Sequence, residues 1–204
     1  MVSLIPQAFV GSAQSLLGFG EESPSKRGRF VDSILRQAGR PMHEQWDLAF
    51  IHHVGWWSQR APSGTYSVWP FPRHATHRDL AAIAAERHLI RTSPEPGDIV
   101  LYWSDDLRQY VRSAIIVMAA LESLDPTATP RYVCRTIEGN LTERGDYGGM
   151  YVREMDRTLA PSQGDLFIRW AMLDSRNALG DPSMDLYLEA GRPKLAAADP
   201  GRAA

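Results

Sequence analysis

Hydrophobic residues recur with a helical period in three segments of the first half of the chain. Over residues 29–38 the spacing is i, i+3/i+4 and ends at Gly39, which predicts an amphipathic helix carrying Phe30, Val31, Ile34, Leu35 and Ala38 on one face. Asp47 precedes a second apolar run directly, in the position of an N-capping residue for a helix that ends near Trp57. An alanine-rich third helix is predicted over residues 76–88, capped near Thr76.

From Gly97 onward the hydrophobic pattern changes to short β-type runs separated by turn residues. These runs cover residues 98–103, 113–121, 132–138, 150–155 and 165–170. Helices followed by strands predict an α+β domain with an antiparallel sheet.

No composition break or internal repeat divides the 204 residues, so we expect one domain over residues 25–175 with an extension at each end. Residues 1–24 are expected to form a tethered arm or a short helix. Residues 176–204 are expected to be a partly disordered C-terminal extension, because the sequence after residue 186 is rich in Ala, Pro, Gly and charge. Residues 58–73, rich in Pro, Gly and aromatics, predict a loop of the kind that lines a cleft.

Charge and cysteine content narrow the function classes. A net charge of −2 gives no electrostatic case for a nucleic-acid partner or an anionic membrane. One cysteine excludes an internal disulfide and a four-thiolate zinc site. No apolar run approaches the ~20 residues of a membrane span, and the N-terminus does not resemble a secretory signal. The expected location is cytoplasmic by default, with export by a non-standard route left open.

Four short phrases carry the chemical information: residues 45–51 (Gln-Trp-Asp-Leu-Ala-Phe-Ile), 94–100 (Pro-Glu-Pro-Gly-Asp-Ile-Val), 111–117 (Val-Arg-Ser-Ala-Ile-Ile-Val) and 135–140 (Arg-Thr-Ile-Glu-Gly-Asn). In order and spacing they resemble the CHAP family, papain-like amidases and peptidases that cut peptidoglycan stem peptides and related amides. The family reads Trp-Cys-Ala-x-Phe, Pro-x-Pro-Gly-Asp-hydrophobic-Val, Gly-His-Val-Gly-Ile-Val and Ile-Glu-Gly-Asn. The resemblance covers roughly residues 26–170 and implies a papain-like fold, with N-terminal helices packed on an antiparallel sheet of about five or six strands.

The catalytic pair of that family is missing. Asp47 stands in the place of the nucleophilic Cys, and Ser113 stands in the place of the general-base His. Glu138 and Asn140, which in the family orient the imidazole, are kept. The resemblance therefore implies a catalytically inactive relative, with Asp47, Ser113, Glu138 and Asn140 as vestigial positions that converge at one cleft.

Each retained position has two interpretations. Asp47 could be only a helix cap or could contact a ligand. Residues 138–140 could be kept for a turn, in which Gly139 permits an unusual backbone angle, or could face a pocket. If Glu138 lies near Asp47, a cation is needed between them, and the candidates are Arg108, Arg135 and Arg144, with Arg112 less suitable because it alternates away from Ser113.

Other reactive side chains do not replace the missing pair. His52 and His53 lie on different helical faces from Asp47. Cys134 is expected to be a buried strand residue rather than a relocated nucleophile. His74 and His77, spaced i, i+3, could supply half of a metal site, but no acidic third ligand is obvious.

The sequence favours a pseudoenzyme that acts as a binding module for a peptide, glycan-peptide or protein partner, with no cofactor and no metal. The predicted ligand contacts are Trp46, Asp47, Trp69, Trp103, Ser113 and Glu138. One alternative is a hydrolase with an altered or metal-dependent site, for example a metal held by Asp47, Glu138 and a histidine. Another is a structural or assembly component, phage- or secretion-related. The oligomeric state is left open.

Overall fold

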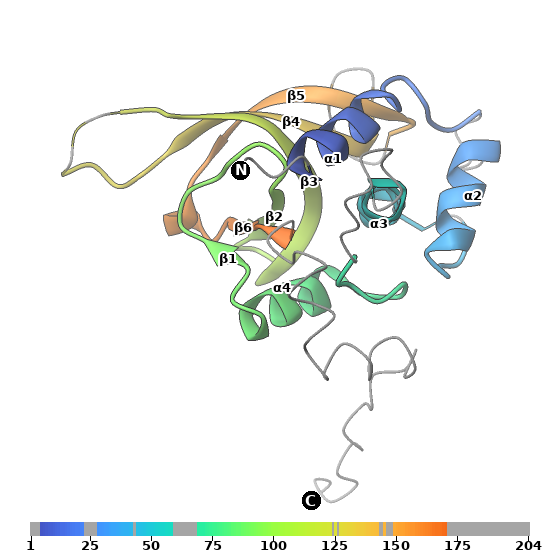
Figure 1. Ribbon diagram of the computed structural model, residues 1–204, viewed down its shortest axis with the longest axis horizontal. Coiled ribbons are helices and arrows are strands. Elements are labelled where there is room, and N and C mark those ends of the chain that lie inside the picture. Colours follow the sequence, from blue (N-terminus) through green and yellow to red (C-terminus); the bar gives the residue numbers. More distant parts are fainter. Residues whose placement is uncertain are drawn as a thin grey trace, which may run out of the picture.

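Four helices form in the computed structural model: α1 (Ile5–Gln14), α2 (Arg29–Gln37), α3 (Asp47–Ser58) and α4 (His77–Glu86) (Figure 1). The structure describes residues 5–22, 28–42, 44–58, 69–123, 125, 127–142, 145 and 149–170. Helices α2, α3 and α4 confirm the three helices predicted from apolar spacing. The expected C-terminal extension, Arg144 and most of the expected 58–73 loop lie outside the described residues.

The sheet has six antiparallel strands in the order β1-β6-β2-β3-β4-β5. The strands are β1 (Ile90–Arg91), β2 (Ile99–Ser104), β3 (Gln109–Leu121), β4 (Tyr132–Leu141), β5 (Tyr151–Leu159) and β6 (Leu166–Ile168). The α+β class is thus confirmed. Strand β1, which pairs with β6, was not predicted, because two residues are too short to show an alternating pattern.

The two faces of the sheet bury different sets of side chains. One face packs against the helices and carries Ile99, Leu101, Ile115 and Ile137 in the main core. The opposite face holds a smaller cluster of Val100, Ala114, Ile116, Cys134, Leu159 and Phe167. Successive strand residues point to opposite faces, so odd-numbered and even-numbered positions in the middle of β2, β3 and β4 belong to different cores.

Helix α1 is part of the main core, so the short-helix alternative for the N-terminal segment is the one the structure contains. Phe9 is fully buried, and its ring lies 4.9 Å from that of Trp170 and 6.0 Å from that of Trp69. After the helix, Gly20 bridges to Tyr151 of β5. Residues 5–22 are therefore tied to both the helices and the sheet edge.

The Pro94–Asp98 turn is fixed by polar contacts at its end. Asp98 is buried, accepts two hydrogen bonds from the Arg169 guanidinium at 3.0 Å each, and accepts a third from the Glu95 backbone N–H. Burial raises the pKa of Asp98, and the Arg169 hydrogen bonds act in the opposite direction. Gly97 has φ 88 and lies against Pro6, so this phrase has a structural role here.

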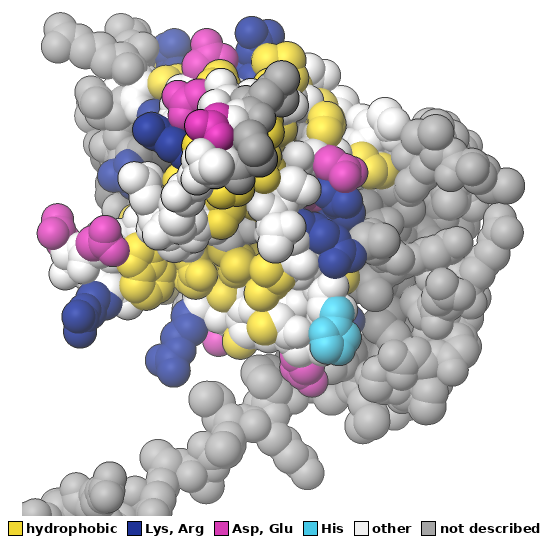
Figure 2. All heavy atoms as spheres, turned by 90° about the vertical axis from the view of Figure 1, so that its left-hand side faces the viewer, with side chains coloured by type: hydrophobic (Ala, Val, Ile, Leu, Met, Phe, Trp, Pro, Cys, Tyr) yellow, Lys and Arg dark blue, Asp and Glu magenta, His cyan; other side chains and the backbone are white. Residues whose placement is uncertain are grey.

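The β3–β4 hairpin extends away from the helices (Figure 1). Figure 2 looks onto that side of the molecule and shows hydrophobic side chains at the surface among charged ones. Met118, Leu121 and Val133 on the hairpin are 46%, 45% and 41% exposed. None of the helices in the described part of the chain is both long and apolar enough to cross a membrane.

Candidate functional site

Asp47 begins helix α3, and its carboxylate joins this helix to two other elements. Oδ2 accepts hydrogen bonds from the Ser113 backbone N–H at 3.0 Å, from Ser113 Oγ at 3.1 Å, and pairs with His77 Nε2 at 3.0 Å. The Asp47 side chain is only 4% exposed. The positive end of the α3 dipole also favours a negative charge at this position. The recorded bonds of Asp47 thus lead to β3 and α4 and not to its own helix, so the predicted capping role is not seen among the described residues.

Ser113 lies on the helix-facing side of β3, paired with Leu101 of β2. It is fully buried, and both its backbone N–H and its hydroxyl are directed at Asp47. The predicted proximity of Asp47 and Ser113 is confirmed at hydrogen-bond distance. Because Asp47 and Ser113 lie far apart in the sequence, their contact is a property of the fold and not of the composition.

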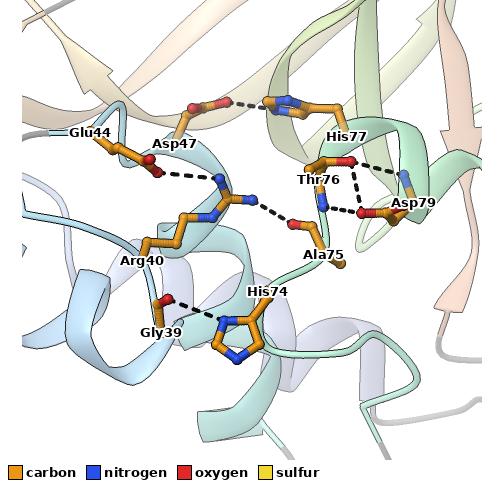
Figure 3. A network of polar contacts seen from close by, with 9 residues as sticks. All are labelled: Gly39, Arg40, Glu44, Asp47, His74, Ala75, Thr76, His77 and Asp79. Carbon is orange, nitrogen blue, oxygen red and sulfur yellow. Dashed lines mark hydrogen bonds and ion pairs between the residues drawn. The ribbon is translucent and has the colours of Figure 1, made fainter. Parts of the chain in front are cut away.

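His77 is the contact that sequence reasoning missed. Thr76 caps α4 through a capping box with Asp79, which places His77 in the first turn of that helix (Figure 3). The neighbouring loop is held against α2: Arg40 donates to the Ala75 carbonyl at 2.6 Å, and His74 Nδ1 lies 3.1 Å from the Gly39 carbonyl oxygen (Figure 3). These contacts fix the start of α4 beside the start of α3, and so bring the imidazole of His77 to Asp47.

An open cleft of about 1180 Å³ lies over this contact. Asp47 and His77 line it, together with side chains from the β2–β3 turn, the C-terminal side of α2 and the first turns of α4. Its apolar lining includes Leu48, Ala81, Trp103, Leu107, Tyr110 and Val111, and its charged lining includes Arg40, Glu44, Arg78, Arg108 and Arg112. The volume is slightly above the usual range of about 300–1,000 Å³ for ligand pockets.

Glu138 does not share this cleft, which corrects the prediction that it converges with Asp47 and Ser113. Its neighbour Ile137 packs in the helix-facing core, and a Cβ on Gly139 would meet Trp46 and Phe50. Glu138 therefore points to the opposite face of the sheet.

The carboxylate of Glu138 has its own set of donors on that face. Arg157 donates from Nε at 2.8 Å and from Nη2 at 3.0 Å, and the hydroxyls of Thr136 and Tyr102 donate at 2.8 and 3.0 Å. Arg157, which was not among the arginines proposed from the sequence, thus supplies a cation beside Glu138. A metal held jointly by Asp47 and Glu138 is excluded by their places on opposite faces.

The unusual backbone angle that was expected at Gly139 is found at its neighbour Asn140. The left-handed backbone belongs to Asn140, with φ 65, a conformation that Asn tolerates better than most residues. Gly139 is instead required for close approach, because an added Cβ would lie 2.8 Å from the Trp46 ring. Asn140 is buried and lies in β4 where the pairing with β5 shifts register.

The predicted aromatic contacts divide into core and cleft residues. Trp46 is fully buried and its indole N–H donates to Glu21 at 2.9 Å. Trp69 is 5% exposed and its N–H donates to His52 Nδ1 at 2.9 Å. Both pack in the core and leave a ligand no surface in this structure. Trp103 lines the cleft.

The remaining reactive side chains are held in structural positions. Burial lowers the pKa of His52 to about 3, with a further contribution from the Arg40 charge, so its imidazole is neutral. Burial raises the pKa of the Cys134 thiol to about 11, which makes it a poor nucleophile, and the predicted burial of this residue is confirmed. Within the described residues no three His, Cys, Asp or Glu side chains are grouped closely enough to hold a metal ion.

The chemistry available at the cleft differs from a nucleophile–base pair. Asp47 Oδ2 has three recorded polar contacts, two from Ser113 and one with His77 Nε2, so this oxygen is poorly placed to attack an electrophile. The Ser113 hydroxyl donates to the Asp47 carboxylate, and among the described residues no hydrogen bond from it to an imidazole is recorded. His77, whose side chain is 17% exposed, brings an imidazole to this contact.

Comparison with protein-family models, with curated proteins and with solved structures gave no match to this chain.

Proposed function

We propose that the chain is a catalytically inactive CHAP-like domain whose cleft binds a peptide, glycan-peptide or protein partner. The Asp47–Ser113–His77 contact carries this proposal. It occupies the place where the family resemblance puts a Cys and a His, and it ties α3, β3 and α4 together through Asp47 Oδ2.

The cleft above that contact supports a binding role. Its wall combines apolar side chains, such as Trp103, Leu107 and Tyr110, with several charged ones. Mixed apolar and polar lining is typical of a pocket that holds a ligand and fixes its orientation. Loss of nucleophile and base together lowers kcat by about 10⁶-fold in a triad enzyme, so the same pocket without them retains recognition and loses turnover.

Binding can be tested by titrating the isotope-labelled protein with a soluble stem-peptide fragment of peptidoglycan and following backbone amide shifts. We expect the shifts to concentrate on the cleft residues, with Trp103 among them. Leu107→Ala is the test variant, because Leu107 is 62% exposed in the cleft wall. Leu121→Ala is its matched control, since Leu121 is 45% exposed but lies on the β3–β4 hairpin, outside the cleft.

The proposal fails if shifts are absent from the cleft, or if Leu121→Ala weakens the interaction as much as Leu107→Ala. Turnover must be measured on the same samples by release of free amine. Hydrolysis of the fragment by the unmodified protein, lost in Asp47→Ala, would show an enzyme instead of a binding module.

One observation favours a hydrolase as the second candidate. His77 Nε2 lies 3.0 Å from Asp47 Oδ2 in an open cleft, and a carboxylate–imidazole pair is a common way to hold a general base. If Nε2 carries the proton toward Asp47, the Nδ1 lone pair of His77 could activate a water. In that case the unmodified protein hydrolyses amides or esters, and this activity disappears in His77→Gln. The pseudoenzyme proposal instead expects no turnover in the unmodified protein or in His77→Gln.

A further inference from the structure

The cleft carries an excess of positive charge although the whole chain is slightly acidic. Its lining includes Arg40, Arg78, Arg108 and Arg112 but only two carboxylates, Glu44 and Asp47. The net charge of the chain is −2. The lining of the cleft is therefore more positive than the chain as a whole.

Internal contacts account for only part of this charge. Arg40 is 3.4 Å from Glu44 and also donates to the Ala75 carbonyl, while Asp47 is satisfied by Ser113 and His77. Arg78 and Arg108 are exposed, and neither has an ion pair or hydrogen bond within the described part of the chain. Arg112, half-buried on β3, also lines the cleft but has an interaction within the protein, so the guanidinium groups available to a ligand are those of Arg78 and Arg108.

Two of the nearby acidic side chains, Asp79 and Asp105, are engaged elsewhere. Asp79 accepts hydrogen bonds from the backbone N–H and hydroxyl of Thr76 in the capping box. Asp105, in the turn after β2, accepts from the Trp103 indole at 2.9 Å. Neither lines the cleft, so they do not neutralise its arginines from within.

The backbone at Arg108 adds an independent observation. Its φ is 51, in the left-handed region where a glycine would be unstrained and a long side chain is uncommon. Unusual backbone conformations are tolerated where the surrounding structure imposes them, often at binding sites. Here the strained turn presents a guanidinium to the cleft.

We propose, resting on the binding function above, that the cleft recognises the carboxylates of an acidic peptide segment, with Arg78 and Arg108 as the principal contacts. Planar guanidinium groups match carboxylates in bidentate geometry. The apolar wall of Trp103, Leu107 and Tyr110 accommodates the backbone and apolar side chains of the same segment. An extended polyanion such as nucleic acid is less favoured, because the chain as a whole is slightly acidic.

The test uses fluorescein-labelled hexaglutamate and hexaglutamine peptides with the full chain, followed by fluorescence anisotropy at low and at physiological ionic strength. We expect hexaglutamate to bind, hexaglutamine not to bind, and added salt to weaken the complex. The Arg78→Gln/Arg108→Gln variant should bind about fivefold to tenfold more weakly. The matched control is Arg131→Gln/Arg135→Gln, which removes two exposed arginines from β4 and its preceding turn.

Arg108→Gly separates binding from folding, because it removes the guanidinium and relieves the left-handed backbone. We expect this variant to melt no lower than the unmodified protein and to bind hexaglutamate more weakly. Equal binding by the cleft and control variants, equal binding of hexaglutamine, or full displacement of the peptide by inorganic phosphate or by a short single-stranded oligonucleotide would overturn the proposal. If hexaglutamate fails while a stem-peptide fragment still shifts the cleft amides, the binding function stands and the acidic specificity does not.

Discussion

The ion pair between Glu138 and Arg157 should govern the stability of the sheet rather than the cleft. Glu138 is fully buried, whereas the Arg157 side chain is 25% exposed. Arg157→Met leaves the carboxylate with the hydroxyls of Thr136 and Tyr102 but without its bidentate cation. Removing one partner of a buried ion pair costs about 3–5 kcal/mol, because a buried charge is left uncompensated.

The cost here should lie toward the lower end of that range. Water can enter where the partly exposed guanidinium stood, so we expect a loss of about 2–4 kcal/mol in the free energy of unfolding. For a chain of this size, that loss corresponds to a fall in Tm of about 5–15 °C. Adding Glu138→Gln should recover much of the loss, since a neutral amide oxygen still accepts from Thr136 and Tyr102 and leaves no buried charge.

The measurement is urea denaturation of the two single variants and the double variant. Arg135→Met is the control on the same pair of strands, because Arg135 is 47% exposed and its ion pairs with Glu154 and Asp156 are worth about 0–1 kcal/mol. The reasoning is refuted if Arg157→Met costs less than the control, or if the effects of the two single substitutions simply add. A loss of cleft binding in Glu138→Gln with unchanged stability would return Glu138 to the site.

Three further outcomes follow from buried contacts. The pKa of His52 in the folded state, about 3, lies below its ordinary value, so the unfolded chain binds the proton first and stability falls as pH drops from 6.5 toward 3. The expected loss in the free energy of unfolding is about 2 kcal/mol at pH 5. Denaturation curves of His52→Gln should show a smaller loss, and an equal loss would count against the assignment. Asp47→Cys should place a thiol beside the His77 imidazole, giving faster alkylation at neutral pH than the same change in a His77→Gln background, whereas equal rates would mean that the pair does not form. Gly139→Ala should lower the free energy of unfolding by about 1–3 kcal/mol, because its Cβ would meet the Trp46 ring at 2.8 Å. Gly11→Ala in α1, with open space around it, should instead stabilise the protein by about 0.5–1 kcal/mol. Similar melting temperatures for the two variants would contradict the packing argument.

The parts of the fold that follow local rules could be predicted from the sequence. The apolar spacing over residues 29–38 and the Thr76 cap fixed α2 and α4 to within one or two residues, because helical period and capping depend on neighbours in sequence. The proximity of Asp47 and Ser113 was also predicted, as an implication of the family resemblance that the four phrases carry.

The errors all concern relations between elements. Alternation places Glu138 and Ile137 on opposite faces, but only the packing of α3 determines which face looks into the cleft. The Arg157 partner comes from β5, and the His77 contact depends on how the loop before α4 docks against Arg40 and Gly39. No local signal in the sequence encodes these distances.

At the start of α3, the Asp47 carboxylate is held in a rigid arrangement. A nucleophile must be held by few contacts so that it can reach a substrate. Asp47 Oδ2 instead has three recorded contacts with two other elements and ties α3 to β3 and α4. A preorganised cleft loses less conformational entropy when it binds a ligand. Under the proposed function, the contacts that hold Asp47 therefore favour recognition of a ligand.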